Sequence, residues 1–297
     1  MAKKSSSISH SLLPQSSLSD WAIFKRDNSA RIGLLILGII FTLTVFSSII
    51  SEDPGLRDAG AHLVPPSWEE NGTPDHLLGT DMLGRDLFSR LLNGSYLTIG
   101  TASISVLIAL LLGIALGIFS ATLRGNAQLL VMRLIDVILA IPSLILAIII
   151  VAILGSGLLN AGIAVSLVLL PNFVRLTNSF VIEEMSKPYV AAARLDGAKS
   201  GRILLKIIFP NVAASLVIQT TFSLSTAIID IAALGFLGLG AQPPLPEWGS
   251  MLYEARTSMY LAPWSVAIPG FAIFLTVFCI NLVGDGMNSA INSKSRT

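Results

Sequence analysis

The 297-residue sequence has few charged residues. Asp, Glu, Lys and Arg make up 12% of it, whereas 53% of it is hydrophobic and the net charge is +1. A soluble domain carries about 25% charged residues, so this chain has too few to cover a surface that faces water. The composition predicts a membrane protein, and the near-zero net charge argues against a nucleic-acid-binding protein, which needs a basic patch.

Residue types that build catalytic and metal sites are also scarce. The one cysteine, Cys279, lies in an apolar run, and the three histidines, His10, His62 and His76, lie outside every apolar run. The sequence contains no CxxC pair, no Cys/His metal spacing and no GxxxxGK[ST] phosphate loop. We therefore expect no internal disulfide, no metal, no cofactor and no ATP hydrolysis by this chain.

Six apolar runs are long enough to cross a bilayer as helices, because about 20 residues at 1.5 Å per residue span a hydrocarbon core of about 30 Å. The sequence therefore predicts an all-α fold, a polytopic membrane helical bundle with six transmembrane helices. The polar, Ser-rich segment before the first run lacks the features of a signal peptide. The predicted spans are Ile32–Ile50, Tyr96–Ala121, Gln128–Leu154, Leu158–Phe180, Val212–Leu237 and Trp264–Met287.

The basic residues indicate the orientation of the chain. If the N-terminus is cytoplasmic, 15 of the 19 Lys and Arg residues lie on the inner side and 4 on the outer side, as the positive-inside rule requires. We expect cytoplasmic tails at 1–31 and 291–297, a first transmembrane helix at 32–50, a periplasmic segment at 51–95 and a five-helix core at 96–290. The periplasmic segment would carry an amphipathic helix over Thr80–Leu92, capped by Thr80 or Asp81, at the membrane interface or against protein.

Three charged residues in the predicted spans are candidate pathway or structural residues, because a charge at the bilayer centre costs about 2.5–3.5 kcal/mol. Asp230 in the fifth span either lines a pathway or forms a buried hydrogen bond between helices. An ion pair with Arg133, three residues earlier, would explain Asp136. Arg175 can reach the inner interface with its long side chain. The GxxxG pattern Gly113–Gly117 is typical of close helix packing.

The longest and most basic inner loop, 181–211, is the best candidate for an interaction site. Its Ala-rich part favours a helix, Gly197 offers a break, and residues 201–209 can form a second short helix before Pro210 and the fifth span. A short helix–turn–helix with small residues at its bend forms a compact knob that fits a groove on another protein. The candidate residues are Tyr189, Ala191, Ala192, Ala193, Arg194, Gly197, Ile207 and Pro210.

This loop resembles the EAA motif of ABC-importer permeases, EAAxxxG followed by IxxP. Ala191 stands where that motif has its glutamate, and the matching positions are Ala192, Ala193, Gly197, Ile207 and Pro210. Three other stretches, Leu78–Arg90, Asp230–Gly249 and Asn281–Gly286, resemble the dipeptide, oligopeptide and nickel group of these permeases. The likeness covers about residues 25–291.

The resemblance implies a fold, partners and a mechanism. The fold would be the all-α MetI-like fold of type I importer permeases in the bacterial inner membrane. The partners would be a homologous second permease, two ABC ATPase subunits, a periplasmic peptide-binding protein and membrane lipid. This chain would be the non-catalytic subunit that forms half of the pore for di- or oligopeptides, and its loop would couple ATPase closure to pore opening.

Other functions stay open from the sequence. An antimicrobial-peptide or nickel permease subunit would use the same scaffold. A proton-driven secondary carrier working alone would depend on Asp230, and its uptake would collapse with the proton gradient. An intramembrane protease would need histidine within the spans, where the sequence has none.

Overall fold

The computed structural model describes residues 24–51, 53–58, 60–123 and 125–292. Apart from one isolated bridge between Thr80 and Asp86, the regular elements of this described part are helices. The all-α class is therefore confirmed. Most residues of the predicted cytoplasmic tails, 1–31 and 291–297, lie outside the described part.

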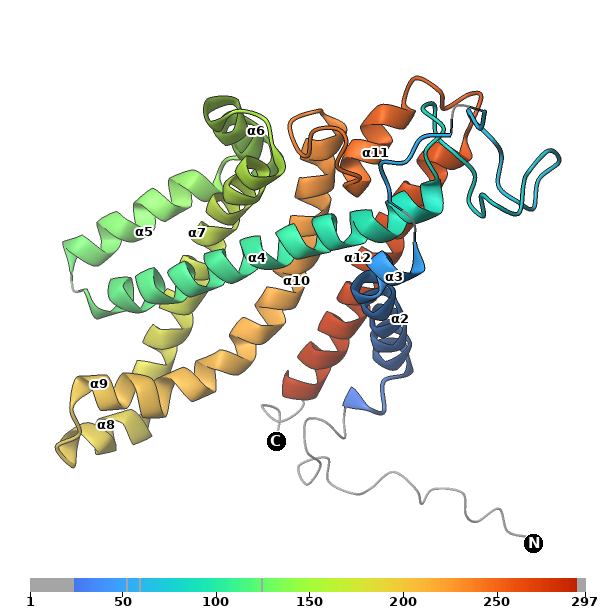
Figure 1. Ribbon diagram of the computed structural model, residues 1–297. Helices are drawn as coiled ribbons and strands as arrows, with labels where there is room; N and C mark the ends of the chain where they lie inside the picture. Colours follow the sequence, from blue (N-terminus) through green and yellow to red (C-terminus); the bar gives the residue numbers. More distant parts are fainter. Residues whose placement is uncertain (1–23, 52, 59, 124, 293–297) are drawn as a thin grey trace, which may run out of the picture.

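Five helices are long and apolar enough to cross a membrane. They correspond to five of the six predicted spans, and Figure 1 shows them as the long rods of the molecule. At 36 residues, α4 is about 54 Å long and exceeds a bilayer core of about 30 Å, so it must tilt or extend beyond the core. The five are α2 (Asn28–Val45), α4 (Leu87–Thr122), α7 (Leu158–Met185), α10 (Phe209–Phe236) and α12 (Trp264–Asn292).

The prediction of one continuous helix over Gln128–Leu154 is wrong. The segment forms two helices, α5 (Asn126–Leu139) and α6 (Ser143–Leu154), which meet at a bend of 91°. Pro142 lies in the break, and proline both lacks an N–H and disfavours helical geometry at the preceding residue. The described part has six spans if this bent pair crosses the membrane as one unit, and five if it does not.

The predicted amphipathic helix over Thr80–Leu92 is also wrong in its first half. Helix α4 begins only at Leu87, and its cap is Asp86, which accepts a hydrogen bond from the Ser89 amide at 2.7 Å. Thr80 is buried in the isolated bridge with Asp86, and its hydroxyl accepts a hydrogen bond from the Val64 amide at 2.8 Å. Gly84 has a φ of +71°, which excludes it from a right-handed helix.

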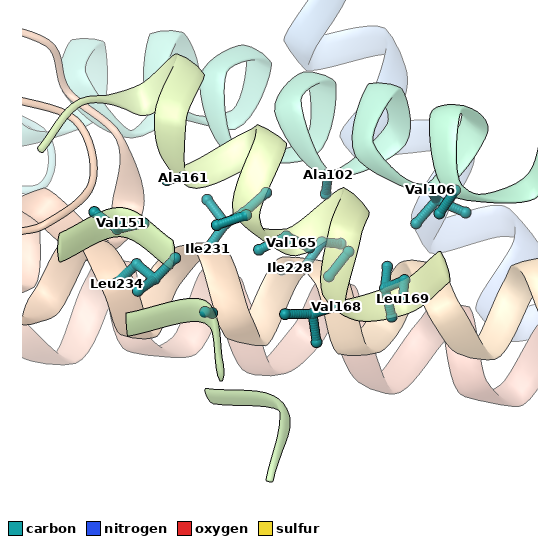
Figure 2. Close-up of a cluster of buried hydrophobic side chains, with 14 of the residues drawn as sticks. Ala102, Val106, Val151, Ala161, Val165, Val168, Leu169, Ile228, Ile231 and Leu234 are labelled. Carbon is teal, nitrogen blue, oxygen red and sulfur yellow. The ribbon is translucent and has the colours of Figure 1, made fainter. Parts of the chain in front are cut away.

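The main core lies where α4, α6, α7 and α10 meet, and Figure 2 shows its aliphatic side chains pointing toward one another. The predicted role of Gly113 and Gly117 in helix packing is confirmed. A Cβ added at Gly113 would lie 2.3 Å from the Cβ of Phe173, and one at Gly117 would lie 2.5 Å from that of Thr177. Glycine thus allows α4 and α7 to pack closely.

Short helices lie at the two ends of the bundle. Helices α8 (Pro188–Leu195) and α9 (Ser200–Ile203) form a turn at one end, where α7 and α10 meet (Figure 1). Helix α11 (Trp248–Ala255) lies at the other end, beside the beginning of α4 and the loop that precedes it. α3 (Ser47–Ile50) follows α2. Any interaction at α8 and α9 therefore acts on the opposite end from α11.

Candidate coupling site

Helix α8 confirms the helix that the Ala-rich segment predicts. It begins with Pro188, whose missing N–H needs no acceptor in the first turn of a helix. It ends before Gly197, which has a φ of +80° and donates its amide to the Arg194 carbonyl at 3.1 Å. A residue with a Cβ is strained at this positive φ, so Gly197 fixes the tight turn between α8 and α9.

The predicted second short helix is present but continues directly into the fifth predicted span. Helix α9 passes through a five-residue π-helical segment, Leu204–Ile208, and then into α10. Pro210 is the second residue of α10 and directly follows this segment. We call residues 188–208 the coupling knob. The knob is thus joined to α10 without an intervening loop.

One side of the coupling knob packs against its own bundle and the other is open. Val190, Ile203 and Ile208 are buried in one apolar cluster, and Ala193 packs against that cluster. Leu195 is 89% exposed, and Leu205 is 69% exposed. Leucines this exposed on a helical hairpin are a typical feature of a protein contact surface.

A hydrogen-bonded cluster ties the coupling knob to α7 and α10. Glu184 at the end of α7 is buried and accepts hydrogen bonds from Lys187 Nζ at 2.5 Å and from Asn211 Nδ2 at 2.9 Å. Asn211 Nδ2 also donates to the hydroxyl of Tyr189 at 3.1 Å and to the Ile207 carbonyl at 3.0 Å. We call Glu184, Lys187, Tyr189 and Asn211 the clasp.

The clasp was largely missed by sequence reasoning. Only Tyr189 was among the candidate residues, and the i, i+3 spacing of Glu184 and Lys187 was the one available signal. The hydrogen bond to Glu184 raises the pKa of Lys187 above its ordinary value, so the ammonium stays charged at neutral pH. The remaining candidates, Ala191, Ala192 and Arg194, lie exposed on α8.

Asp136 and Arg175 are brought together, although the sequence predicted Arg133 as the partner of Asp136 and a place at the inner interface for Arg175. Arg175 Nη1 on α7 lies 3.0 Å from Asp136 Oδ1 on α5, so the partner of Asp136 is Arg175 and not the predicted Arg133. The side chains are 56% and 48% exposed. The pair thus bridges two helices while remaining open on one side.

Asp230 lies on α10 and is 5% exposed. Its Oδ2 atom has no hydrogen-bond partner among the described residues, so the predicted bond between helices is not made by that atom. Five residues earlier, Ser225 donates a hydrogen bond to Asn281 Oδ1 on α12 at 2.9 Å. A pathway role for Asp230 stays a prediction.

A second ionic cluster lies at the α11 end of the bundle. Glu254 of α11 accepts hydrogen bonds from both Arg85 and Arg90, the latter at 2.8 Å. Arg85 Nε also donates to Asp81 Oδ2 at 2.6 Å. Both guanidinium groups are buried, with exposed fractions of 3% and 1%. This cluster fixes the segment before α4 against α11, and sequence reasoning did not identify Glu254.

Glu247 anchors α11 from the loop that follows α10. Its carboxylate accepts hydrogen bonds from the amides of Gly249 and Ser250, each at 2.9 Å, and from the Thr98 hydroxyl at 3.0 Å. Burial raises the pKa of Glu247, although these three hydrogen bonds act in the opposite direction. Glu247 therefore caps α11 and holds it against α4.

Comparison with known proteins finds relatives among the membrane components of transport systems. Residues 113–297 match the family described as binding-protein-dependent transport system inner membrane component. The chain is 46% identical to the di/tripeptide transport system permease protein DppC of Pseudomonas aeruginosa, over 92% of this chain and 91% of the relative. It is 42% identical to the dipeptide transport system permease protein DppC of Escherichia coli K12, over 92% of each chain.

Two further relatives extend the comparison. The peptide transport system permease protein SapC of Escherichia coli O6:H1 is 46% identical, over 91% of this chain and 92% of the relative. Among solved structures, a chain of the inward-facing MetNI methionine ABC transporter aligns with a TM-score of 0.57 and 21% identity. That alignment covers 70% of this chain and 97% of the other, so the two share the MetI-like fold.

Proposed function

The chain belongs to the family of binding-protein-dependent transport system inner membrane components, and on that premise we propose that it forms half of a pore for di- and oligopeptides. It is a multi-pass inner-membrane permease subunit of an ABC importer. The peptide assignment is supported by relatives at 41–46% identity, named for di/tripeptide, dipeptide and peptide transport. The other half of the pore would come from a homologous permease.

The coupling knob is the observation that supports this function best. Its exposed apolar residues, such as Leu195, give a partner a surface to bind, and its buried side is fixed to α7 and α10. Two ATPase subunits would provide the partner groove, and their closure on ATP would move the knob as a rigid unit. Such a movement can switch a pore between two states without chemistry in this chain.

The orientation follows from the same assignment. The coupling knob would face the cytosol and α11 the periplasm, where a peptide-binding protein would deliver substrate. Both termini would then be cytoplasmic, in agreement with the distribution of Lys and Arg. Ala191 is exposed on α8, where a docking partner would meet it.

Uptake of labelled dipeptide tests the proposed function. The chain is reconstituted in vesicles with its second permease, two ATPases and the binding protein, and accumulation is measured with and without ATP. We expect uptake that needs ATP and is insensitive to a proton uncoupler. ATP-dependent uptake of nickel instead of peptide would overturn the substrate, and uptake that needs only a proton gradient would overturn the mechanism.

A further inference from the structure

The Asp136–Arg175 ion pair joins two helices in the cytoplasmic half of the proposed membrane-spanning part. Asp136 is ten residues from the beginning of α5 and Arg175 is ten residues from the end of α7. At 1.5 Å per residue, each lies about 15 Å along its helix from the end nearest the cytoplasmic side in the proposed orientation. Because α7 is about 42 Å long and exceeds a hydrocarbon core of about 30 Å, the pair lies in the cytoplasmic half of the core and not at its centre.

The charges of this pair make lipid an unfavourable surrounding for its open side. About half of each side chain is open, at 48% for Asp136 and 56% for Arg175. Charged groups at membrane depth face a bundle interior or a water-filled cavity, because lipid gives them no hydrogen bonds. The open side of the pair therefore faces either water or another protein.

The break between α5 and α6 lies directly beside the pair. Leu139 ends α5 only three residues after Asp136, and Asn172 on α7 precedes Arg175 by three. No side chain caps the first turn of α6. In a membrane, such broken backbone is tolerated only where protein or water satisfies its polar groups.

A cavity of about 410 Å³ lies at this break. Its walls come from residues 138–143 of the broken segment and from α7, with Ser143 and Asn172 among the polar residues. Small-ligand pockets have volumes of about 300–1,000 Å³, so the cavity is large enough for part of a short peptide. Figure 1 shows α5 and α6 meeting beside α7 at the periphery of the bundle.

We propose that the Asp136–Arg175 pair and the adjoining cavity at the α5–α6 break form a peptide-binding station of the translocation path. This inference rests on the proposed function and adds to it a place where the chain contacts its substrate. A peptide crossing the membrane carries an ammonium, a carboxylate and unpaired main-chain amides. Asp136 offers a partner for the peptide ammonium, and Arg175 offers one for the peptide carboxylate. The main-chain amides of the peptide can bond to Ser143, Asn172 and the open backbone of the break.

This arrangement explains how one site can accept peptides of different sequence. The two charges and the backbone groups recognise features that every peptide shares, and the apolar wall of the cavity imposes no single side-chain shape. An exposed ion pair has a net strength of about 0–1 kcal/mol, so it opens easily to exchange partners with the peptide. Broken helices at midplane binding sites use the same principle in other transporters.

Cysteine labelling tests whether the station faces water. The native Cys279 is buried, and Cys279→Ala gives a cysteine-free background. In that background we introduce Asn172→Cys, and Phe274→Cys as the matched control. Phe274 lies within α12, ten residues from its beginning and about 15 Å along the helix, and it is 59% exposed on an aromatic stretch.

In the fully assembled transporter, we expect Asn172→Cys to react with a membrane-impermeant thiol reagent and Phe274→Cys to remain unreactive. Saturating dipeptide with binding protein and ATP should slow the first reaction by about fivefold. Equal, low reactivity of both cysteines would overturn the proposal, since partner protein or lipid would then cover the station. Reactivity that dipeptide does not change would overturn the binding role.

Charge reversal tests the role of the pair in substrate contact. Arg175→Glu should change the ratio of uptake of a doubly basic to a doubly acidic dipeptide by about fivefold in favour of the basic one. Arg175→Lys is the control and should leave the ratio unchanged. A purely structural pair would scale both peptides equally, and that result overturns the proposal. Uptake of neutral dipeptide by the Cys279→Ala transporter separately tests the proposed function.

Discussion

The clasp predicts that a single carboxylate keeps ATP hydrolysis coupled to transport. Glu184→Ala removes the acceptor for Lys187 and Asn211, which donate to it at 2.5 and 2.9 Å. Hydrogen bonds to a charged group contribute about 1.5–3 kcal/mol each. The Lys187 side chain is 44% exposed and recovers water when the bond is lost, so its share is reduced to about 0–1 kcal/mol.

The total loss is therefore about 1.5–4 kcal/mol, and the Asn211 share, about 1.5–3 kcal/mol, is lost between α7 and the beginning of α10. A change of about 2 kcal/mol alters an equilibrium between fixed and displaced knob positions by about 30-fold. The ATPases would still move the knob, but part of each movement would be absorbed between α8 and α10. We expect ATP hydrolysis to remain within about twofold of the unaltered transporter while peptides imported per ATP fall by about fivefold to tenfold.

The assay measures both quantities in the same vesicles, as phosphate released and labelled dipeptide accumulated. Glu183→Ala is the matched control, because Glu183 is the preceding residue on α7 and lies exposed. Its ratio of peptide to ATP should equal that of the unaltered transporter. If Glu184→Ala gives the same ratio as Glu183→Ala at equal abundance in the membrane, the clasp has no coupling role and the reasoning is refuted.

Three further predictions concern the two ends of the bundle. Gly197→Pro should disrupt the turn of the coupling knob, and Ala193→Glu should disrupt its packed side. Either change should abolish dipeptide uptake without reducing the amount of chain in the membrane, and uptake at the normal rate would contradict this. Leu195→Cys in the Cys279→Ala background should react with impermeant thiol reagent only from the cytosolic side, and periplasmic labelling would reverse the proposed orientation. Glu254→Gln should destabilise the purified chain by about 1–3 kcal/mol, seen as a lower midpoint of thermal unfolding, since it removes a carboxylate that two buried guanidinium groups share and leaves them with Asp81. An unchanged midpoint would show that Asp81 alone is sufficient.

The places of five of the six long helices could be predicted because hydropathy depends on the solvent and not on tertiary contacts. A run of about 20 apolar residues needs no partner to specify a membrane helix. The coupling knob could also be predicted, since Gly197 and the alanines before it are local signals for a helix and its end. In both cases the information lies within a few residues of the structure that it determines.

The break at Pro142 could not be predicted in the same way. Pro171 lies within α7 and Pro269 within α12, and both helices continue through them. Proline alone therefore does not distinguish a tolerated position from a break of 91°. What differs is the packing of the flanking segments: α5 has no buried residue among those described, whereas α6 packs into the main core.

The outer segment shows a second limit of sequence reasoning. The apolar spacing in Thr80–Leu92 suits a helix, but the segment is held in a turn by contacts that are distant in sequence. Arg85 pairs with Glu254, 169 residues away, and a Cβ at Gly84 would lie 2.1 Å from the Asp58 carbonyl oxygen. Such long-range contacts override local helix propensity, and no pattern within the segment reveals them.

The π-helical segment Leu204–Ile208 is the point at which the coupling knob could bend relative to α10. Its wider turns are rare in helices and occur often at functional sites. The clasp crosses this segment, because Asn211 bonds both to the Ile207 carbonyl within it and to Glu184 on α7. A movement of the knob would therefore be transmitted through this hydrogen-bonded segment to α10. The 28 residues of α10 extend for about 42 Å toward the opposite end of the bundle. Coupling by the proposed lever would therefore depend as much on the buried residues behind the knob as on its exposed surface, where Ala191 lies.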